Sequence, residues 1–204
     1  LSSEAALKYV IYGAGIAGVM LYGISLMAGM LGTTDMSLIA ERMHLLLSPE
    51  ADGADLSVRS NAMLRTVVLA SLLISAGVAF KLSLVPFHFW CPDAFEGAPA
   101  EVAGFLSVAS KAAAFALLVR FCLALVGKDS GALSEHVYLY LGVGLGVVAA
   151  ITATFGNLAA YSQTNIKRLL AYSTIAHAGY MLMAVAAMMV LVNSDVADAK
   201  LKAA

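Results

Sequence analysis

Long apolar segments alternate with shorter polar ones along the whole chain. Apolar residues dominate five segments, at about 5–30, 66–92, 102–126, 137–161 and 169–192, and each has the length of a helix rather than of a strand. Because a helix rises about 1.5 Å per residue, about 20 apolar residues cross the hydrocarbon layer of a bilayer. The pattern therefore predicts an all-α integral membrane protein with about five transmembrane helices in a single membrane domain.

The longest polar stretch is residues 31–61, which the pattern makes an extramembrane connection. Within it, the segment from Met36 to Leu47 places apolar side chains at roughly helical spacing, which is typical of a helix that lies along the membrane interface. The chain opens on Leu1-Ser2-Ser3-Glu4, without an initiator methionine or a basic leader, so we expect residue 1 to lie inside a longer protein.

The composition agrees with a membrane protein. Of 204 residues, 61% are hydrophobic and 12% are charged, and the mean hydropathy is +0.88. Soluble proteins are about 45–50% apolar and about 25% charged. The net charge of −1 comes without a basic patch, which argues against a nucleic-acid partner. Cys91 has only His88 near it at ligand spacing and Cys122 has none, so both are expected to be buried thiols and no metal site is predicted.

One apparent nucleotide-binding motif lies in the first segment. Gly13, Gly15 and Gly18 match the G-x-G-x-x-G pattern of dinucleotide-binding proteins. That motif requires a short strand before it and alternating strands after it, whereas this apolar run continues to Met30. The small residues Gly13, Ala14, Ala17 and Gly18 are instead expected to allow close helix packing in lipid, and a soluble nucleotide-binding enzyme is disfavoured.

Two lysines lie inside apolar segments, Lys81 in 66–92 and Lys111 in 102–126. An ammonium group in hydrocarbon is costly unless it is paired, hydrated or deprotonated. Pro86 removes a backbone donor, so the helix is predicted to break near 81–86, just after Lys81. Transporters commonly place ion sites at broken helices. Both lysines are therefore predicted to handle protons, and the alternative for Lys81 is a side chain that snorkels to the headgroups.

The position of Lys111 favours a functional role. It lies about ten residues into its segment, which places it about 15 Å deep and near the bilayer midplane. Ser107 lies one helical turn before it and Ser110 beside it, and their hydroxyls can hold water next to an amine. Arg120, nearer the far end of the same helix, is expected to snorkel.

Other polar residues leave two interpretations open. His88 is either a buried structural histidine or a proton relay. Ser173, His177 and Tyr180 share one face of the last helix, which indicates either a water-lined seam or a hydrogen-bonded seam between helices.

Two further features are interpreted as structural. Asp93 and Glu96 lie in an acidic turn and are predicted to cap a helix end, the alternative being a proton entrance. The glycine- and alanine-rich segment 137–161 carries no charge and is predicted to be a packing surface.

Several runs of sequence carry a resemblance to a known family. They are EAALKY at 4–9, FKLSLVPFHFW at 80–90, EGAP at 96–99, SVASKAA at 107–113 and QTNIKRLLAYSTIAHAGY at 163–180. By these runs the chain resembles the antiporter-like subunit N family of the proton-pumping NADH:quinone oxidoreductase, respiratory complex I, which is called subunit 2 in mitochondria and chloroplasts. The family is related to Mrp-type cation/proton antiporters.

This resemblance implies an arrangement and a set of site residues. The five spans would be helices six to ten of a fourteen-helix subunit. Lys81 would be the lysine of the broken seventh helix, paired with a glutamate on a helix outside this chain, and Lys111 the central lysine of the eighth helix. The proton-translocating residues are then expected to be Lys81, Lys111, His88, Lys8, Lys167 and His177.

The resemblance also implies a function and a setting. The chain is expected to pass protons through buried lysines and water, driven by redox chemistry in other subunits. NADH, FMN, iron–sulfur clusters and quinone are expected in those partner subunits and no cofactor or catalytic residue in this chain. The expected partners are other membrane subunits and lipid, most naturally in a bacterial plasma membrane, with mitochondrial and thylakoid membranes as alternatives. An Mrp-type Na⁺/H⁺ antiporter subunit and an inert membrane scaffold remain the alternative functions.

Overall fold

The computed structural model describes residues 2–47, 56–126 and 132–203, and within them the side chains of 2–39, 41–42, 63–125 and 139–191. All of the secondary structure in these ranges is helical. The helices are α1 Ser2–Leu31, α2 Met36–Leu47, α3 Leu56–Leu82, α4 Trp90–Gly97, α5 Ala100–Val126, α6 Ala132–Tyr161 and α7 Ile166–Ala203.

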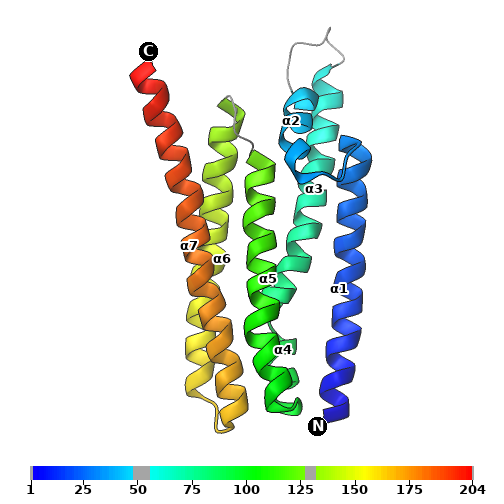
Figure 1. The fold of residues 1–204 in the computed structure, drawn as a ribbon, viewed down its shortest axis with the longest axis vertical. Coiled ribbons are helices and arrows are strands. Elements are labelled where there is room, and N and C mark those ends of the chain that lie inside the picture. Colours follow the sequence, from blue (N-terminus) through cyan, green and yellow to red (C-terminus); the bar gives the residue numbers. More distant parts are fainter. Residues whose placement is uncertain (1, 48–55, 127–131, 204) are drawn as a thin grey trace.

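Within the described residues, five helices, α1, α3, α5, α6 and α7, are long and apolar enough to cross a membrane. They stand side by side, with α7 and α6 at one edge of the molecule and α1 and α3 at the other (Figure 1). The short α4 lies at the same end as the N-terminus, and α2 lies at the opposite end. The all-α membrane class predicted from the hydrophobic pattern is confirmed.

The turn from α1 to α2 is built from local hydrogen bonds. Gly32 takes a positive φ of 64°, which glycine adopts without a steric penalty, and its N–H donates to the carbonyl of Ala28 at 2.8 Å. Asp35 then accepts from the N–H of Ser37 at 2.9 Å at the start of α2, and this hydrogen bond lowers the pKa of the Asp35 carboxyl. The helix predicted over 36–47 is confirmed, its place at the interface stays a prediction, and residues 48–55 of the predicted connection lie outside the described residues.

The helix break agrees with the sequence pattern, and two later helix boundaries differ from it. The predicted 66–92 helix is broken, as expected, because α3 ends at Leu82. The segment predicted as a turn after it forms much of α4. The last helix continues to Ala203, beyond the predicted end at 192, because the polar tail consists largely of residues that favour helix, such as Ala, Leu and Lys.

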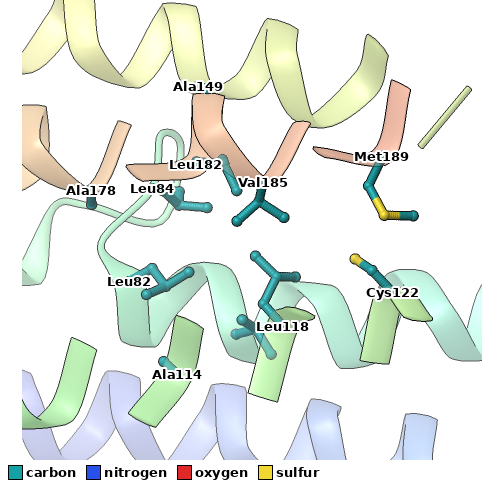
Figure 2. Packing of buried hydrophobic residues seen from close by; sticks show 11 residues of the cluster. Leu82, Leu84, Ala114, Leu118, Cys122, Ala149, Ala178, Leu182, Val185 and Met189 are labelled. Atoms are coloured by element: carbon teal, nitrogen blue, oxygen red, sulfur yellow. The ribbon is translucent and has the colours of Figure 1, made fainter. Parts of the chain in front are cut away.

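The largest buried cluster holds four of the long helices, α3, α5, α6 and α7, and the helix break together. Leu82, the last residue of α3, and Leu84, in the loop after it, pack with residues of α5, α6 and α7 (Figure 2). Leu118 of α5 and Leu182 of α7 are 5% and 0% exposed in this cluster. The break is thus fixed from both sides by apolar contacts, which is what a precisely placed site near it requires.

Glycines set the closest helix approaches. A Cβ atom at Gly156 of α6 would lie 2.7 Å from the backbone nitrogen of Ala176, and one at Gly179 of α7 would lie 2.6 Å from that of Ala153. The predicted packing role of the 137–161 segment is confirmed. The same expectation for the small residues at 13–18 stays a prediction: a Cβ atom at Gly13 would contact Phe80 at 3.9 Å, while one at Gly18 meets nothing within 4 Å in the described residues. In α1 the close approach occurs instead at Gly23, which packs against α3.

Candidate functional site

The break after α3 leaves backbone groups that find partners nearby. The carbonyl of Phe80 accepts two hydrogen bonds, from Ser83 N–H and from the indole Nε1–H of Trp90, both at 3.0 Å. Phe80 and Trp90 are 1% and 3% exposed, so this contact is shielded from water. The last turn of α3 is therefore bonded, at the residue before Lys81, to the first residue of α4.

The loop between α3 and α4 is also held by α6. The N–H of Val85 donates to Oγ1 of Thr152, at 3.1 Å, and Thr152 is fully buried. Pro86 follows through a cis peptide bond and its side chain is exposed. Pro86 thus lies in the break, as predicted, and a buried threonine of another helix supplies the acceptor for the loop beside it.

Lys81 lies in the last turn of α3 and its side chain is exposed on this chain. Its Nζ atom is 5.7 Å from the ring centroid of Tyr9 of α1, within cation–π distance. Among the ion pairs of the described residues, none involves Lys81. Lys81 thus lies beside α1, with the Tyr9 ring as its neighbour.

Lys111 is buried within the bundle, only 2% exposed. Its Nζ atom donates to the carbonyl oxygen of Thr174 in α7 at 2.9 Å. A carbonyl can accept from an ammonium group and, more weakly, from a neutral amine, whereas the full negative charge of a carboxylate partner would favour the charged form much more strongly. The contact that holds Lys111 is therefore compatible with both of its protonation states.

A groove of about 260 Å³ reaches Lys111 from the surface of the chain. Its lining residues come from α5 and α7: Ser107, Val108, Lys111, Ala112, Thr174, His177 and Met181. The predicted neighbour Ser107 and the predicted site residue His177 thus share one groove with Lys111. Hydroxyl, imidazole and amine groups around a space of this size can hold ordered water between them.

His88 lies in the loop after the break and contacts α6. Its ring lies 4.4 Å from that of Phe155, centroid to centroid. Its Nδ1 atom is buried and forms no hydrogen bond with the residues that the structure describes. The ring thus packs against α6, and a relay role for His88 stays a prediction.

Tyr180 and His177 lie on the same helix, α7, but make different contacts. The side-chain amide of Asn157 in α6 donates to the Tyr180 hydroxyl, while the edge of the Tyr180 ring meets His177 at 6.0 Å. The stripe predicted from the spacing therefore has two parts. Tyr180 belongs to a hydrogen bond between helices, and His177 belongs to the groove of Lys111.

Lys8 belongs to a group of charged side chains that joins α1, α4 and α7 at one end of the bundle. Its Nζ atom forms ion pairs with Glu4 at 2.8 Å and with Asp93 at 2.9 Å. Arg168 of α7 pairs with Asp93 at 3.0 Å and with Glu96 at 2.8 Å. We call these five residues the ionic clasp. Asp93 and Glu96 were predicted to cap a helix, which is wrong, because their carboxylates bridge three helices instead.

The clasp has a clear electrostatic effect on Asp93. The hydrogen bond from Lys8 above all, with the positive charges of Lys8 and Arg168, holds the pKa of the Asp93 carboxyl below its ordinary value. The carboxylate is therefore ionised throughout the physiological range.

Lys167 lies beside the clasp, at the start of α7, and is exposed. Its Nζ atom donates to the carbonyl of Ala98 at 3.1 Å, and its backbone N–H donates to Oδ1 of Asn165 at 2.9 Å. The structure thus places Lys8 and Lys167 together at one end of the bundle. Lys111 and His177 meet in the groove, and Lys81 and His88 flank the break.

Sequence reasoning missed two residues at the Lys111 position. Thr174 provides the carbonyl that holds Lys111, and its hydroxyl lies 3.8 Å from the sulfur of Cys91 in α4. A main-chain acceptor leaves no trace in residue types, so no pattern signalled it. The available signal was that Thr174 is a hydroxyl residue among apolar ones, one turn before His177.

The chain combines three features: apolar helices of membrane-spanning length, a helix broken beside one lysine, and a second lysine buried at a groove. They are typical of the polytopic ion-translocating membrane proteins, in which broken helices and intramembrane ionisable groups mark the ion path. Comparison with known families gives the family. The model described as "NADH:quinone oxidoreductase/Mrp antiporter, TM" matches residues 1–195, and the chain belongs to that family.

Curated relatives carry the name NADH-quinone oxidoreductase subunit N. The protein from Anaeromyxobacter sp. is 42% identical over 190 residues, which cover 91% of this chain and 36% of the relative. Subunit N 2 from Solibacter usitatus is 47% identical over 186 residues, which cover 91% of this chain and 33% of the relative. The chain thus spans about a third of the length of the curated relatives that it matches.

Solved structures have the same fold. A chain of respiratory complex I from Thermus thermophilus matches with a TM-score of 0.62 and 36% identity, over 89% of this chain and 34% of that one. A chain of the Mrp complex from Dietzia sp. matches with a TM-score of 0.68 over 90% of this chain and 29% of that one; at 22% identity this likeness concerns the fold alone.

Proposed function

We propose that this chain is part of a proton-translocating membrane subunit, subunit N, of an NADH:quinone oxidoreductase. The observation that carries the proposal is the place of Lys111: a buried amine in an apolar helix, held by a carbonyl and reached by a polar-lined groove. Family membership and the names of the relatives support the setting.

The proton path in this proposal uses both lysines. Lys81 and Lys111 alternate between ammonium and amine as protons pass along water, with His177 in the groove and His88 at the break as relays. Lys8 and Lys167, at the end of the bundle, serve where protons enter or leave. A carboxylate from a helix outside this chain pairs with Lys81 and biases its protonation state, since a nearby negative charge favours the cation.

The energy comes from other subunits. NADH, FMN, iron–sulfur clusters and quinone act there, and this chain contributes to the enzyme as its translocating part. Its partners are the neighbouring membrane subunits and lipid, and the bacterial relatives support a plasma-membrane location.

The test is proton translocation by the assembled complex carrying Lys81→Ala or Lys111→Ala in this segment. Protons moved per NADH oxidised should fall in both variants. Arg120→Ala is the matched control, because it removes an exposed cation from the same helix as Lys111. Unimpaired translocation in both lysine variants would defeat the proposal.

A second candidate function is a Na⁺/H⁺ antiporter subunit, because the family description also covers Mrp antiporters. Purification of the native assembly separates the two. Flavin and iron–sulfur subunits that co-purify with the chain support the oxidoreductase, while their absence together with Na⁺-dependent proton movement supports the antiporter. If the chain is instead an inert membrane scaffold, neither Lys81 nor Lys111 changes its charge. Titration of both lysines by isotope labelling tests this alternative.

A further inference from the structure

The short helix α4 contacts Phe80, the residue before Lys81, and Thr174, the residue whose carbonyl holds Lys111. We infer that α4 couples the end of α3, which carries Lys81, to the hydrogen-bond acceptor of Lys111, with Trp90, Cys91 and Thr174 as positioning residues. This inference rests on the proposed function, in which the two lysines are successive stations on one proton path.

The first contact joins α3 to α4. The indole of Trp90 donates to the carbonyl of Phe80, the residue before Lys81, at 3.0 Å. The same indole stacks against the Phe80 ring with a centroid distance of 5.2 Å. Because both residues are almost fully buried, the end of α3 and the start of α4 move together.

The second contact joins α4 to α7 one residue later. The sulfur of Cys91 lies 3.8 Å from Oγ1 of Thr174, and Cys91 is fully buried. The Thr174 hydroxyl donates its single proton to the carbonyl of Ala171 at 2.8 Å. The Cys91 thiol is therefore the donor in its contact with Thr174, since a hydroxyl has only one proton to give.

The third contact reaches the lysine. The carbonyl of Thr174 accepts from Nζ of Lys111 at 2.9 Å, so one residue meets α4 with its side chain and α5 with its backbone. A shift of α4 along α7 displaces this carbonyl and changes how Lys111 is held. Packed helices with two discrete arrangements transmit such shifts between sites.

The ionic clasp anchors α4 to α7 at a second position, near the start of α7. Asp93 and Glu96 of α4 pair with Arg168, six residues before Thr174 on α7. Ala94 and Phe95 of α4 are buried in one cluster with Ala171 of α7. The contact between α4 and α7 is thus long enough for α4 to act on α7 as a unit.

The test uses the assembled complex with variants in this segment. Thr174→Val keeps the shape of the side chain and removes the hydroxyl, while Thr174→Ser keeps the hydroxyl. Thr174→Val should lower the number of protons moved per NADH and displace the pH profile of translocation, whereas Thr174→Ser restores both. A purely structural role would affect yield or thermal stability and leave the pH profile in place.

The cysteine offers a second, independent comparison. Cys91→Ala removes the thiol donor and should impair translocation, whereas Cys91→Ser keeps a donor and should retain most of it. Cys122→Ala is the matched control, because Cys122 is equally buried but packs in the apolar cluster with Leu118 and Met189.

A double variant tests the coupling itself. Trp90→Phe keeps an aromatic ring and removes the donor to Phe80. If α4 couples the two ends, Trp90→Phe combined with Thr174→Val is no worse than the more severe single variant. Independent contacts would multiply their separate effects, and that result overturns the inference.

The inference and the proposed function fail in different ways. Loss of translocation in Lys111→Ala together with a normal pH profile in Thr174→Val and Cys91→Ala overturns the inference alone. Normal translocation in both lysine variants overturns the proposed function as well. Should Thr174→Val fail to assemble, Trp90→Phe and Cys91→Ala carry the same test.

Discussion

The Nζ atom of Lys8 lies 2.9 Å from Oδ2 of Asp93, which joins the first turns of α1 to the short helix α4 across 85 positions of sequence. Arg168 approaches the other carboxylate oxygen of Asp93 at 3.0 Å. One aspartate thus connects three helices at the end of the bundle where the helix break also lies.

The ionic clasp should make the thermal stability of the protein depend on pH. The pKa of Asp93 is lower in the folded chain than its ordinary value of 3.8, so its contribution is complete above that ordinary value and is lost as pH falls through the folded-state pKa. The thermal unfolding midpoint of the purified complex should fall between about pH 5 and about pH 2, and Asp93→Asn should reduce that dependence.

Glu101→Gln is the control for the clasp, because Glu101 is exposed at the start of α5. Pairs as accessible as these contribute about 0.2–1 kcal/mol each, so the expected change is a few degrees at most. An Asp93→Asn variant with the acid sensitivity of the native complex would contradict the role given to the clasp.

Thr152→Val should loosen the helix break. Thr152 supplies the acceptor for the Val85 N–H, and a buried N–H without a partner costs about 1–3 kcal/mol. Hydrogen exchange of the amides at 83–89 should become faster in the variant. Thr154→Val, on the exposed face of the same helix, should leave this exchange unchanged.

Gly156→Ala should separate α6 from α7. The new Cβ atom would lie 2.7 Å from the backbone nitrogen of Ala176, and overpacking of this kind costs about 1–3 kcal/mol. Gly144→Ala in the same helix meets nothing within 4 Å and should be neutral or stabilising. Thermal unfolding of the two variants checks this, and equal midpoints would show that the contact is not tight.

His177 and Tyr180 should have separable roles. His177→Ala should reduce proton translocation, because His177 lines the groove with Lys111. Tyr180→Phe removes only the hydroxyl that bonds Asn157 of α6, so it should cost about 1 kcal/mol of stability and leave translocation intact. Proton pumping and thermal unfolding measured on both variants distinguish them. The reverse pattern would move the proton path from the groove to the α6–α7 contact.

Much of the fold followed from the sequence for a simple physical reason. A membrane helix must satisfy its own backbone and face lipid, so apolar length alone predicted α1, α5, α6 and α7. Pro86 predicted the break because it cannot donate a backbone hydrogen bond. Depth within a segment singled out Lys111, since a charge at that depth requires an explanation.

The sequence was less informative wherever distant residues meet. Asp93 and Glu96 looked like capping residues because their pairing with Lys8 and Arg168 depends on how α1 and α7 pack, which local spacing does not encode. Hydrophobic periodicity reports where helices are and says little about which faces of them touch.

The acceptor for Lys111 belongs to the main chain, and this affects how the site tolerates change over generations. Every residue type at position 174 supplies a carbonyl, so no single codon change there deletes the hydrogen-bonding group itself. Natural variation can alter only where that oxygen lies. Selection at this position therefore acts on geometry, and relatives with a different side chain at 174 would be expected to compensate in α4.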